Sequence, residues 1–482
     1  MNYYDAYGDD AMRLKSLTLE NFRCFERLEL TFPSRDELVD ARRNNDASSQ
    51  MLAVGTTVLV ARNGEGKTAV LDAVADLLGV ALSRFPKMKT PKVKNTDFRL
   101  TWDKESSVKK RSRPPYVRIA AIAFEGDSAI NWDVTLRRDA LARYEIPAGC
   151  GTKEIFAWSD RLIDRINAKE APSEPFPFFA YYGAARSVEY KKPGILRTYG
   201  KAYARRDGYQ DALDGRLDYK KTFDRVYWLE SKRRYLRRER GDFDDELLEH
   251  KTLQLALEKT TPGFKNLRTD VEFIDSFDLA VDYEDADRFK TCRLTSQLSE
   301  GYKNVLALVF DLVTRALILN SELPGITPEQ ILETPGIVLI DEIELHLYPS
   351  WRQRILIDLQ RTFPNVQFIV STQSPLVVSS LPKETLRVLD HGEIIPVDCA
   401  TEGVESQQIL SRIFGVSPAP KENYFVRELK EYAEWEREGL ADSSEGREKY
   451  ERLVAHFGVD YPPLQRIENH RKFIARRKSA DA

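Results

Sequence analysis

Apolar and polar positions alternate twice between residues 13 and 32, around the short segment 21–23. Two alternating runs with a turn between them predict a β-hairpin. Farther along, a short apolar run at 57–60 leads into a glycine-rich turn, and a helical pattern follows at 68–79. The pattern therefore predicts a strand, a tight turn and a helix in immediate succession.

The second half of the chain has the pattern of a buried sheet. Apolar runs at 336–340 and 366–370 predict two buried strands, and the spacing at 350–363 predicts a helix between them. Strand, helix and strand in alternation indicate a parallel sheet. The alternation of apolar and polar residues at 117–136 indicates antiparallel strands. The apolar run at 306–319 predicts a helix. We therefore expect an α/β fold with a mixed, largely parallel sheet as its core and an antiparallel β subdomain.

Shifts in composition divide the chain into four segments. A basic stretch with helical spacing separates two strand-rich regions, and the last part is charged and helical. We predict an N-terminal lobe at 1–185, a basic helical insertion at 186–265, a C-terminal lobe at 266–400 and a helical tail at 401–482.

Composition narrows the class of protein. With 482 residues, the chain is too long for one ordinary core, and 42% hydrophobic residues are enough to fold. The four cysteines lie far apart without a CxxC pair, which is typical of a reducing cytoplasm and not of a cysteine metal site. The apolar run at 305–319 contains Asp311 and Arg315, so we expect a cytoplasmic protein without a membrane span.

The segment 61–68, ARNGEGKT, has the pattern of a P-loop with Ala61 in place of the usual first glycine. Glycines let backbone N–H groups approach phosphate oxygens, and the helix that follows directs its dipole at the same charge. Lys67 should reach the β- and γ-phosphates, and the Thr68 hydroxyl should hold Mg²⁺. An ordinary glycine-rich turn is the alternative. The predicted ATP-binding residues of this loop are Asn63, Gly64, Glu65, Gly66, Lys67 and Thr68.

Two carboxylates end the buried strand at 336–340. Ligands bind at the carboxyl ends of strands in parallel sheets, so Asp341 should assist Mg²⁺ and Glu342 should polarise the attacking water. An exposed acidic turn is the alternative.

A third motif, LSEGYKN, occupies 298–304, just before the long apolar helix. Ser299 and the backbone of Gly301 therefore lie at a helix N-terminus, which attracts anions. The alternative is a plain helix cap in which Ser299 supplies the capping oxygen.

The order of these motifs resembles that of ABC-type ATPases: P-loop, long gap, LSxG, acidic strand, and then 371–375, STQSP. The resemblance spans both ends of 12–380. It implies ATP and Mg²⁺ as ligands and a head-to-tail homodimer, possibly a higher oligomer, in which Ser299 and Gly301 cap the γ-phosphate of the other subunit.

Within that superfamily the chain looks like the RecF/SMC group, through LTLENFR at 17–23 and ELHLYP at 344–349. The resemblance implies that Arg23 lies near the nucleotide and that 344–349 takes the place of the D-loop. It also implies a Q-loop, which we expect near 96–99. Gln373 stands where this group has a switch histidine. Glutamine can donate a hydrogen bond but cannot carry a proton as a base, so ATP hydrolysis is expected to be slow.

Segments 178–186, 206–209 and 413–418 are similar to bacterial antiphage ATPases of the Septu PtuA kind, which also accompany some retrons. That resemblance implies a nucleotide-regulated sensor or scaffold for a separate, PtuB-like HNH nuclease. A RecF-like DNA-repair ATPase that clamps DNA and loads other proteins is the alternative. A nucleotide-binding protein with negligible turnover is a third reading.

Two surfaces are candidates for larger partners. For nucleic acid we predict a basic helix, with 84–113 and 471–478 as weaker candidates and a solvated helix face as the alternative. Its residues are Lys232, Arg233, Arg234, Arg237, Arg238 and Arg240.

In the tail, helically spaced apolar residues predict a nuclease-binding stripe, or else helices that pack on each other. The first stripe comprises Phe425, Leu429, Tyr432 and Trp435, and a second comprises Tyr450, Leu453, Val454 and Phe457.

Overall fold

The computed structural model of the protein has two compact units, Met1–Ser406 and Gln407–Ala482. The structure describes residues 11–33, 55–102, 111–138, 148–168, 170–186, 204–216, 222, 225–226, 247–261, 263–273, 276–285, 288–293, 297–417, 419–420 and 422–480.

A six-stranded sheet forms the centre of the first unit, in the order β15-β14-β3-β13-β12-β8. Five strands are parallel, and β15 pairs antiparallel at one edge. Every residue of β3, β8, β12 and β13 is buried. Strands that are buried on both faces need helices on both sides of the sheet. The strands are β3 (Thr56–Val60), β8 (Phe178–Tyr182), β12 (Gly336–Ile340), β13 (Val366–Thr372), β14 (Leu386–Asp390) and β15 (Glu393–Ile395).

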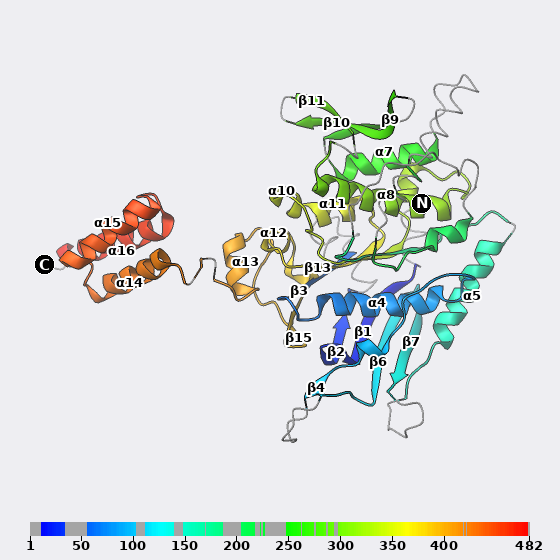
Figure 1. Ribbon diagram of the computed structural model, residues 1–482, viewed down its shortest axis with the longest axis horizontal. Helices are drawn as coiled ribbons and strands as arrows, with labels where there is room; N and C mark the ends of the chain where they lie inside the picture. Colours follow the sequence, from blue (N-terminus) through cyan, green and yellow to red (C-terminus); the bar gives the residue numbers. More distant parts are fainter. Residues whose placement is uncertain are drawn as a thin grey trace. The chain divides into compact units, whose positions relative to one another are not determined.

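Helix α4 (Lys67–Leu82) lies between the central sheet and a second, antiparallel sheet (Figure 1). The second sheet has the order β2-β1-β6-β7 and contains the predicted hairpin, with Leu19 opposite Leu28. Its strands are β1 (Arg13–Phe22), β2 (Phe25–Thr31), β6 (Tyr116–Glu125) and β7 (Ser128–Arg137). Helix α4 is buried on nearly all sides because both sheets pack against it.

A third sheet, β11-β10-β9, is antiparallel and lies near α7 (Leu248–Thr260) in Figure 1. An aromatic cluster connects this sheet to the start of α8 (Glu300–Asn320): Tyr302 packs against Phe264, Tyr283 and Trp351, with ring centroids 5.1, 6.0 and 4.9 Å away. Its strands are β9 (Phe264–Phe273), β10 (Ser276–Asp285) and β11 (Arg288–Arg293).

Shorter elements complete the first unit. They are β4 (Thr101–Trp102), β5 (Arg111–Ser112), α5 (Lys153–Asn167), α9 (Pro328–Leu332), α12 (Pro375–Val378) and the 3₁₀ turns η1 (Asn95–Asp97), η2 (Arg205–Tyr209) and η3 (Lys383–Thr385). The helix α13 (Ser406–Arg412) spans the junction with the second unit.

The expected fold class is confirmed, with one correction to an element. The single helix predicted at 350–363 is two helices, α10 (Pro349–Arg352) and α11 (Ile355–Thr362). Arg354 leaves the helical backbone region, with φ −125° and ψ −18°, and its guanidinium instead binds Asp358 in the first turn of α11. The helices predicted after the P-loop and after the LSEGYKN motif are present as α4 and α8, with α8 beginning directly after Ser299.

The second unit contains three helices around a small core. The core consists of Tyr432, Ala441, Leu453 and Leu464. Asn423 caps the first helix by accepting hydrogen bonds from two backbone N–H groups, and left-handed Gly439 ends it. The helices are α14 (Tyr424–Glu438), α15 (Ser444–Phe457) and α16 (Pro462–Ala480).

Candidate active site

The glycine-rich turn lies between the end of β3 and the first residue of α4. Gly64 and Gly66 have left-handed backbone, with φ of 87° and 95°, a region that residues with a Cβ rarely adopt. Gly66 also has no room for a side chain, because a Cβ there would lie 2.4 Å from the ring of Phe25 and 2.5 Å from Sγ of Cys24. The turn of the β1–β2 hairpin therefore packs directly on the loop.

Lys67 is the first residue of α4, and no side chain caps the helix. Free N–H groups at a helix N-terminus bind anions such as phosphate. The side chain is 6% exposed, and Nζ donates hydrogen bonds to the carbonyl oxygens of Ala61 (2.9 Å) and Arg62 (3.1 Å). Burial lowers the pKa of Lys67, although nearby carboxylates, led by Asp341, oppose the shift. A bound phosphate would replace the two carbonyl partners of this ammonium group.

The remaining predicted loop residues line the open side of the turn. Asn63, Gly64 and Thr68 are exposed. The carboxylate of Glu65 instead accepts a hydrogen bond of 2.8 Å from the backbone N–H of His391, after β14. Glu65 therefore ties the loop to the neighbouring strand.

Thr68 and Asp341 meet at the carboxyl edge of the sheet. The Thr68 hydroxyl donates to Oδ2 of Asp341 over 2.7 Å, and the Ser371 hydroxyl donates to Oδ1. Asp341 is 2% exposed. Adjacent oxygen ligands of an octahedral Mg²⁺ lie about 2.9 Å apart, as its 2.0–2.1 Å bonds require. The separation of the two oxygens and their chemistry therefore fit a magnesium ion.

Glu342 follows in a left-handed conformation, with φ 48°. Its backbone N–H donates to Oγ of Ser371 over 2.8 Å, and its carboxylate accepts a hydrogen bond from Nε2 of Gln373 over 3.2 Å. A non-glycine residue in this region costs about 1–3 kcal/mol and persists only where the surroundings fix it. The structure thus places the two residues predicted to be catalytic, Glu342 and Gln373, in contact with each other.

Sequence reasoning assigned no role to Ser371 or to the carboxylate of Glu344. Ser371 holds both Asp341 and the backbone of Glu342. Glu344 accepts hydrogen bonds from the Thr372 hydroxyl (2.8 Å) and the backbone N–H of Gln373 (2.7 Å). Both residues lie in segments that the motif order had already marked, so only their individual roles went unnoticed.

The segment near 96–99, where the Q-loop is expected, contacts Arg23 of the first hairpin. Residues 95–97 form η1, and Asp97 binds Arg23. One of the two strands beside β12 is β8, and the residues after its end include Arg186. Nη2 of Arg186 donates to the carbonyl oxygen of Glu342 over 2.7 Å, and Nη1 donates to that of Asp341.

Arg23 lies in the turn of the first hairpin and contacts α4. Its Nη1 binds Asp72 over 2.5 Å and its Nε binds Asp97 over 2.9 Å. Burial alone would lower the pKa of Arg23, but the two carboxylates raise it above its usual value. Tyr181 of β8 donates to the same Asp72 over 2.7 Å. Arg23 therefore joins the hairpin to the P-loop helix, one turn beyond the loop itself.

Ser299 and Gly301 lie beside the predicted D-loop segment. Ser299 occupies the N-cap position of α8, yet its side chain makes no capping hydrogen bond and is exposed. The plain helix-cap alternative therefore does not hold. A Cβ on Gly301 would lie 2.5 Å from the carbonyl oxygen of His346, so glycine is required for the close approach of the two segments.

A family model described as an AAA domain matches residues 16–272. The chain belongs to this AAA domain family. A second AAA domain model, whose description names the AbiEii toxin and a Type IV TA system, matches residues 212–379. Together with the motif order, these matches agree on an AAA-type ATPase domain.

Curated relatives of the chain include two retron ATPases and a Septu protein. The chain is 25% identical to the retron Vc95 probable ATPase of Vibrio cholerae over 79% of this chain and 74% of the relative. It is 33% identical to the retron Ec83 probable ATPase of Escherichia coli, over 45% of this chain and 38% of the relative. A 96-residue stretch is 35% identical to the Septu protein PtuA of Bacillus mycoides, covering 20% and 12% of the two chains.

Among solved structures, the SMC head domain from Thermotoga maritima has a TM-score of 0.40 at 15% identity, over 80% of this chain and all of that one. The recombination mediator protein RecF with ATP has a TM-score of 0.35 at 14% identity, over 80% of this chain and 99% of that one. In the described part of the chain, no helix is long and apolar enough to cross a membrane.

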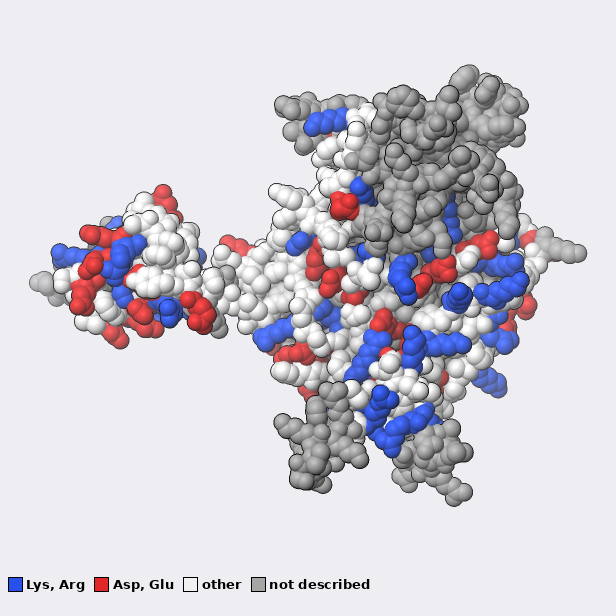
Figure 2. Space-filling model, in the orientation of Figure 1, with Lys and Arg blue, Asp and Glu red and all other residues white. Residues whose placement is uncertain are grey.

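The predicted nucleic-acid helix lies outside the described residues, as does part of the weaker candidate at 84–113. On the face of the first unit that Figure 2 draws, basic and acidic side chains are interspersed. Nucleic-acid binding therefore stays a prediction.

The structure corrects the predicted partner surface of the tail. Tyr432 is fully buried in the core of the second unit, and Leu429 packs against that core. Phe425 stacks on His456 with ring centroids 3.6 Å apart. Trp435 is half-buried, with Nζ of Lys449 4.1 Å from its ring centroid. Most of the apolar stripe thus packs between the three helices, as the alternative prediction of helices that pack on each other stated. The apolar faces of the three helices bury one another.

Proposed function

We propose that this chain binds and slowly hydrolyses ATP, and that it serves as a nucleotide-regulated sensor or scaffold in an antiphage defence system. One observation carries the proposal. Thr68, Asp341, Glu342 and Gln373 come from three separate segments and meet beside the P-loop. An isolated glycine-rich turn or acidic turn would not need these partners.

Each residue takes a role that its position supports. The P-loop N–H groups and Lys67 bind the β- and γ-phosphates. Thr68 and Asp341 hold Mg²⁺, which neutralises charge on the phosphates when bound. Glu342 orients the attacking water and accepts its proton. Gln373, which donates to Glu342 in this structure, would donate to the γ-phosphate instead, and its inability to bear a proton keeps turnover slow.

A second copy of the chain would complete each site. The exposed hydroxyl of Ser299, which caps nothing in its own helix, supports a role toward the γ-phosphate of another subunit. Gly301 packs closely on the predicted D-loop segment at His346, so both segments lie together at the start of α8. The proposed assembly is a head-to-tail homodimer.

The retron and PtuA relatives support an antiphage role. We propose a separate, PtuB-like HNH nuclease as the partner and the tail unit as its binding site. Phe425, Leu429 and Trp435 of the predicted stripe stay partly exposed, and of these we propose Phe425 and Trp435 as contacts for it. Nucleic acid remains a further proposed partner, bound by the basic helix.

Calorimetry with ATP tests the nucleotide site. Lys67→Ala should abolish measurable triphosphate binding, because it removes the positive charge at the β- and γ-phosphates. Lys449→Ala is the matched control, since Lys449 is also buried but pairs with Glu431 in the tail. Unchanged ATP affinity in Lys67→Ala would refute the assignment.

Mixing two damaged chains tests the shared site. A heterodimer of Lys67→Ala and Ser299→Arg chains has one doubly damaged site and one intact site. We expect ATPase activity to return partly on mixing. Proven heterodimers without any recovery would show that each site is complete within one chain.

A further inference from the structure

Arg186 lies where the residues after β8 approach the acidic turn. Its guanidinium is 6% exposed and donates to three backbone carbonyl groups. The acceptors are the carbonyl oxygens of Asp341, Glu342 (2.7 Å) and Gly183 (3.2 Å). The two bonds to the acidic turn come from the two nitrogens Nη1 and Nη2, which lie side by side on one edge of the guanidinium. The side chain therefore donates hydrogen bonds to the carbonyl oxygens of two successive residues at once.

Arg186 binds the acidic turn at Asp341 and Glu342, whose backbone is strained. Glu342 has φ 48°, so its peptide groups are held against their intrinsic preference. From the opposite side, Ser371 accepts the backbone N–H of Glu342, and its carbonyl accepts that of Ile343 (3.1 Å). From β8, the carbonyl oxygen of Tyr182 accepts the backbone N–H of Asp341 over 2.8 Å. The N–H groups of the turn are thus fixed by the two neighbouring strands, and Arg186 fixes its carbonyl groups.

We infer that Arg186 is a positioning residue for ATP hydrolysis, which holds Glu342 in the orientation that its carboxylate needs to act on water. This inference rests on the proposed ATPase function. Arg186 touches main-chain oxygens of the turn, and its effect on the reaction passes through Glu342. If these two hydrogen bonds are lost, the backbone of the turn can relax toward ordinary φ and ψ angles, and the carboxylate of Glu342 moves with it. A displacement of about 1 Å in a reacting geometry can cost about 100-fold in rate.

Arginine suits this task better than lysine does. The guanidinium is a planar fork with fixed donors, so it can serve two acceptors in one geometry, whereas an ammonium is a single point of charge on a flexible chain. Arg186→Lys keeps the charge and most of the volume but cannot hold both carbonyl groups in the same way. The substitution therefore isolates the geometric contribution from the electrostatic one.

The experiment compares Arg186→Lys with Arg387→Lys in the full chain. Arg387 of β14 also donates to backbone carbonyls, those of Glu384 and Leu386, but away from the acidic turn. We expect Arg186→Lys to lower kcat about 100-fold, with ATP affinity and melting temperature within the range of the control. Arg387→Lys should leave kcat unchanged.

A double-mutant cycle tests whether the effect passes through Glu342. Single-turnover hydrolysis of radiolabelled ATP is measured for Glu342→Gln with and without Arg186→Lys. If Arg186 only positions Glu342, the second substitution should lower the residual rate by less than about 3-fold, since effects of residues that act as a unit do not add. A further loss of about 100-fold would overturn the inference.

Further outcomes also test the inference about Arg186. An Arg186→Lys chain that loses ATP binding and melts well below the control would show a structural role and overturn the inference. An unchanged kcat in Arg186→Lys would overturn the inference as well. In that case the ATPase proposal would still stand if the wild type hydrolyses ATP and Glu342→Gln abolishes this activity. A wild-type chain that neither binds nor hydrolyses ATP would instead remove the proposed function on which the inference rests.

Discussion

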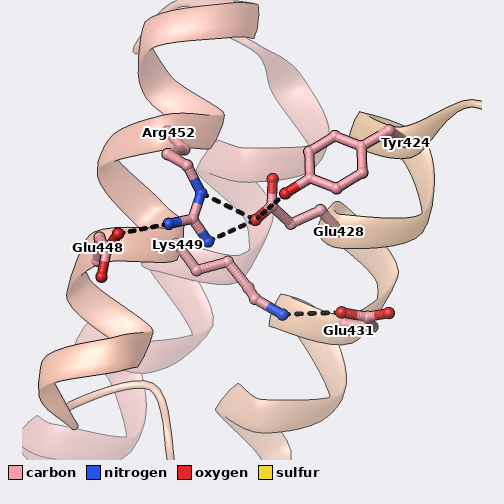
Figure 3. A network of polar contacts seen from close by, with 6 residues as sticks. All are labelled: Tyr424, Glu428, Glu431, Glu448, Lys449 and Arg452. Carbon is pink, nitrogen blue, oxygen red and sulfur yellow. Dashed lines mark hydrogen bonds and ion pairs between the residues drawn. The ribbon is translucent and has the colours of Figure 1, made fainter.

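The candidate active site and the tail both bury a carboxylate, but they satisfy it in different ways. Asp341 accepts hydrogen bonds from Thr68, 273 positions earlier, and from Ser371, 30 positions later. Glu428 of the tail is 4% exposed and accepts from Tyr424 and Arg452, which lie 4 and 24 positions away (Figure 3). The partners of Asp341 are neutral hydroxyl groups, whereas Arg452 neutralises Glu428.

This difference separates a binding site from a structural contact. A buried carboxylate is costly unless it is paired. The Arg452–Glu428 pair is already matched in charge, and Lys449 pairs with Glu431 in the same way (Figure 3). The hydrogen bonds to Asp341 come from hydroxyl groups, and such a set of oxygen atoms suits a cation that arrives with a ligand. The following substitutions test this contrast, from the largest expected effect to the smallest.

Glu342→Gln should have the largest effect on activity. It removes the group that accepts a proton from water but keeps the shape of the side chain, so turnover should fall by about 100- to 10,000-fold. ATP binding should persist and trap the closed dimer, as measured by calorimetry and size-exclusion chromatography. Hydrolysis at the wild-type rate would break the assignment of Glu342.

Tyr432→Ala should have the largest effect on the tail. The side chain is fully buried among Ala441, Leu453 and Leu464, and truncating a buried aromatic residue costs about 3–5 kcal/mol. Limited proteolysis should cut the tail of the variant faster, while ATPase activity stays at the wild-type level. A tail of unchanged protease resistance would show that this contact matters little.

Trp435→Ala should separate packing from partner binding. Trp435 is half-buried and carries Lys449 on its ring, so its loss should disturb the unit less than that of Tyr432. If the nuclease docks there, its affinity should fall by about 2 kcal/mol, or about 30-fold, as for an aromatic hot spot. The measurement is a titration of each chain with the proposed HNH nuclease. Equal affinity of the variant and the wild type would show that the nuclease does not bind at Trp435.

Asp76→Asn should have the smallest effect, and one that depends on pH. Burial raises the pKa of Asp76 to about 7, and Asp97 and Asp72 add to the rise. Between the unfolded value near pH 4 and pH 7, the folded chain keeps a proton that the unfolded chain releases. The wild type therefore loses stability as pH rises through this window, and the neutral variant does not.

The difference in melting temperature between Asp76→Asn and the wild type should grow from near zero at pH 4 to about 1–3 °C at pH 8. Differential scanning fluorimetry at the two pH values measures it. A difference that is the same at both pH values would show that Asp76 does not titrate in this range.

The sequence by itself determined the residues whose chemistry allows few substitutes. The glycines of the P-loop let backbone N–H groups approach phosphate, Lys67 and Thr68 have specific tasks at phosphate and metal, and an apolar strand that ends in Asp341 and Glu342 indicates a sheet edge. Strands and helices around these residues could be predicted because alternation and helical spacing are local properties of the chain.

Only the tertiary structure decided which segments meet. The role of Arg186 depends on β8 lying beside β12, and the task of Ser371 depends on β13 lying on the other side. In the tail, the spacing of Tyr432 predicted burial, but not whether the covering surface was a neighbouring helix or a partner. The physical reason is the same in both cases. Periodicity fixes which face of an element is apolar, whereas strand order and helix packing come from contacts between residues far apart in sequence.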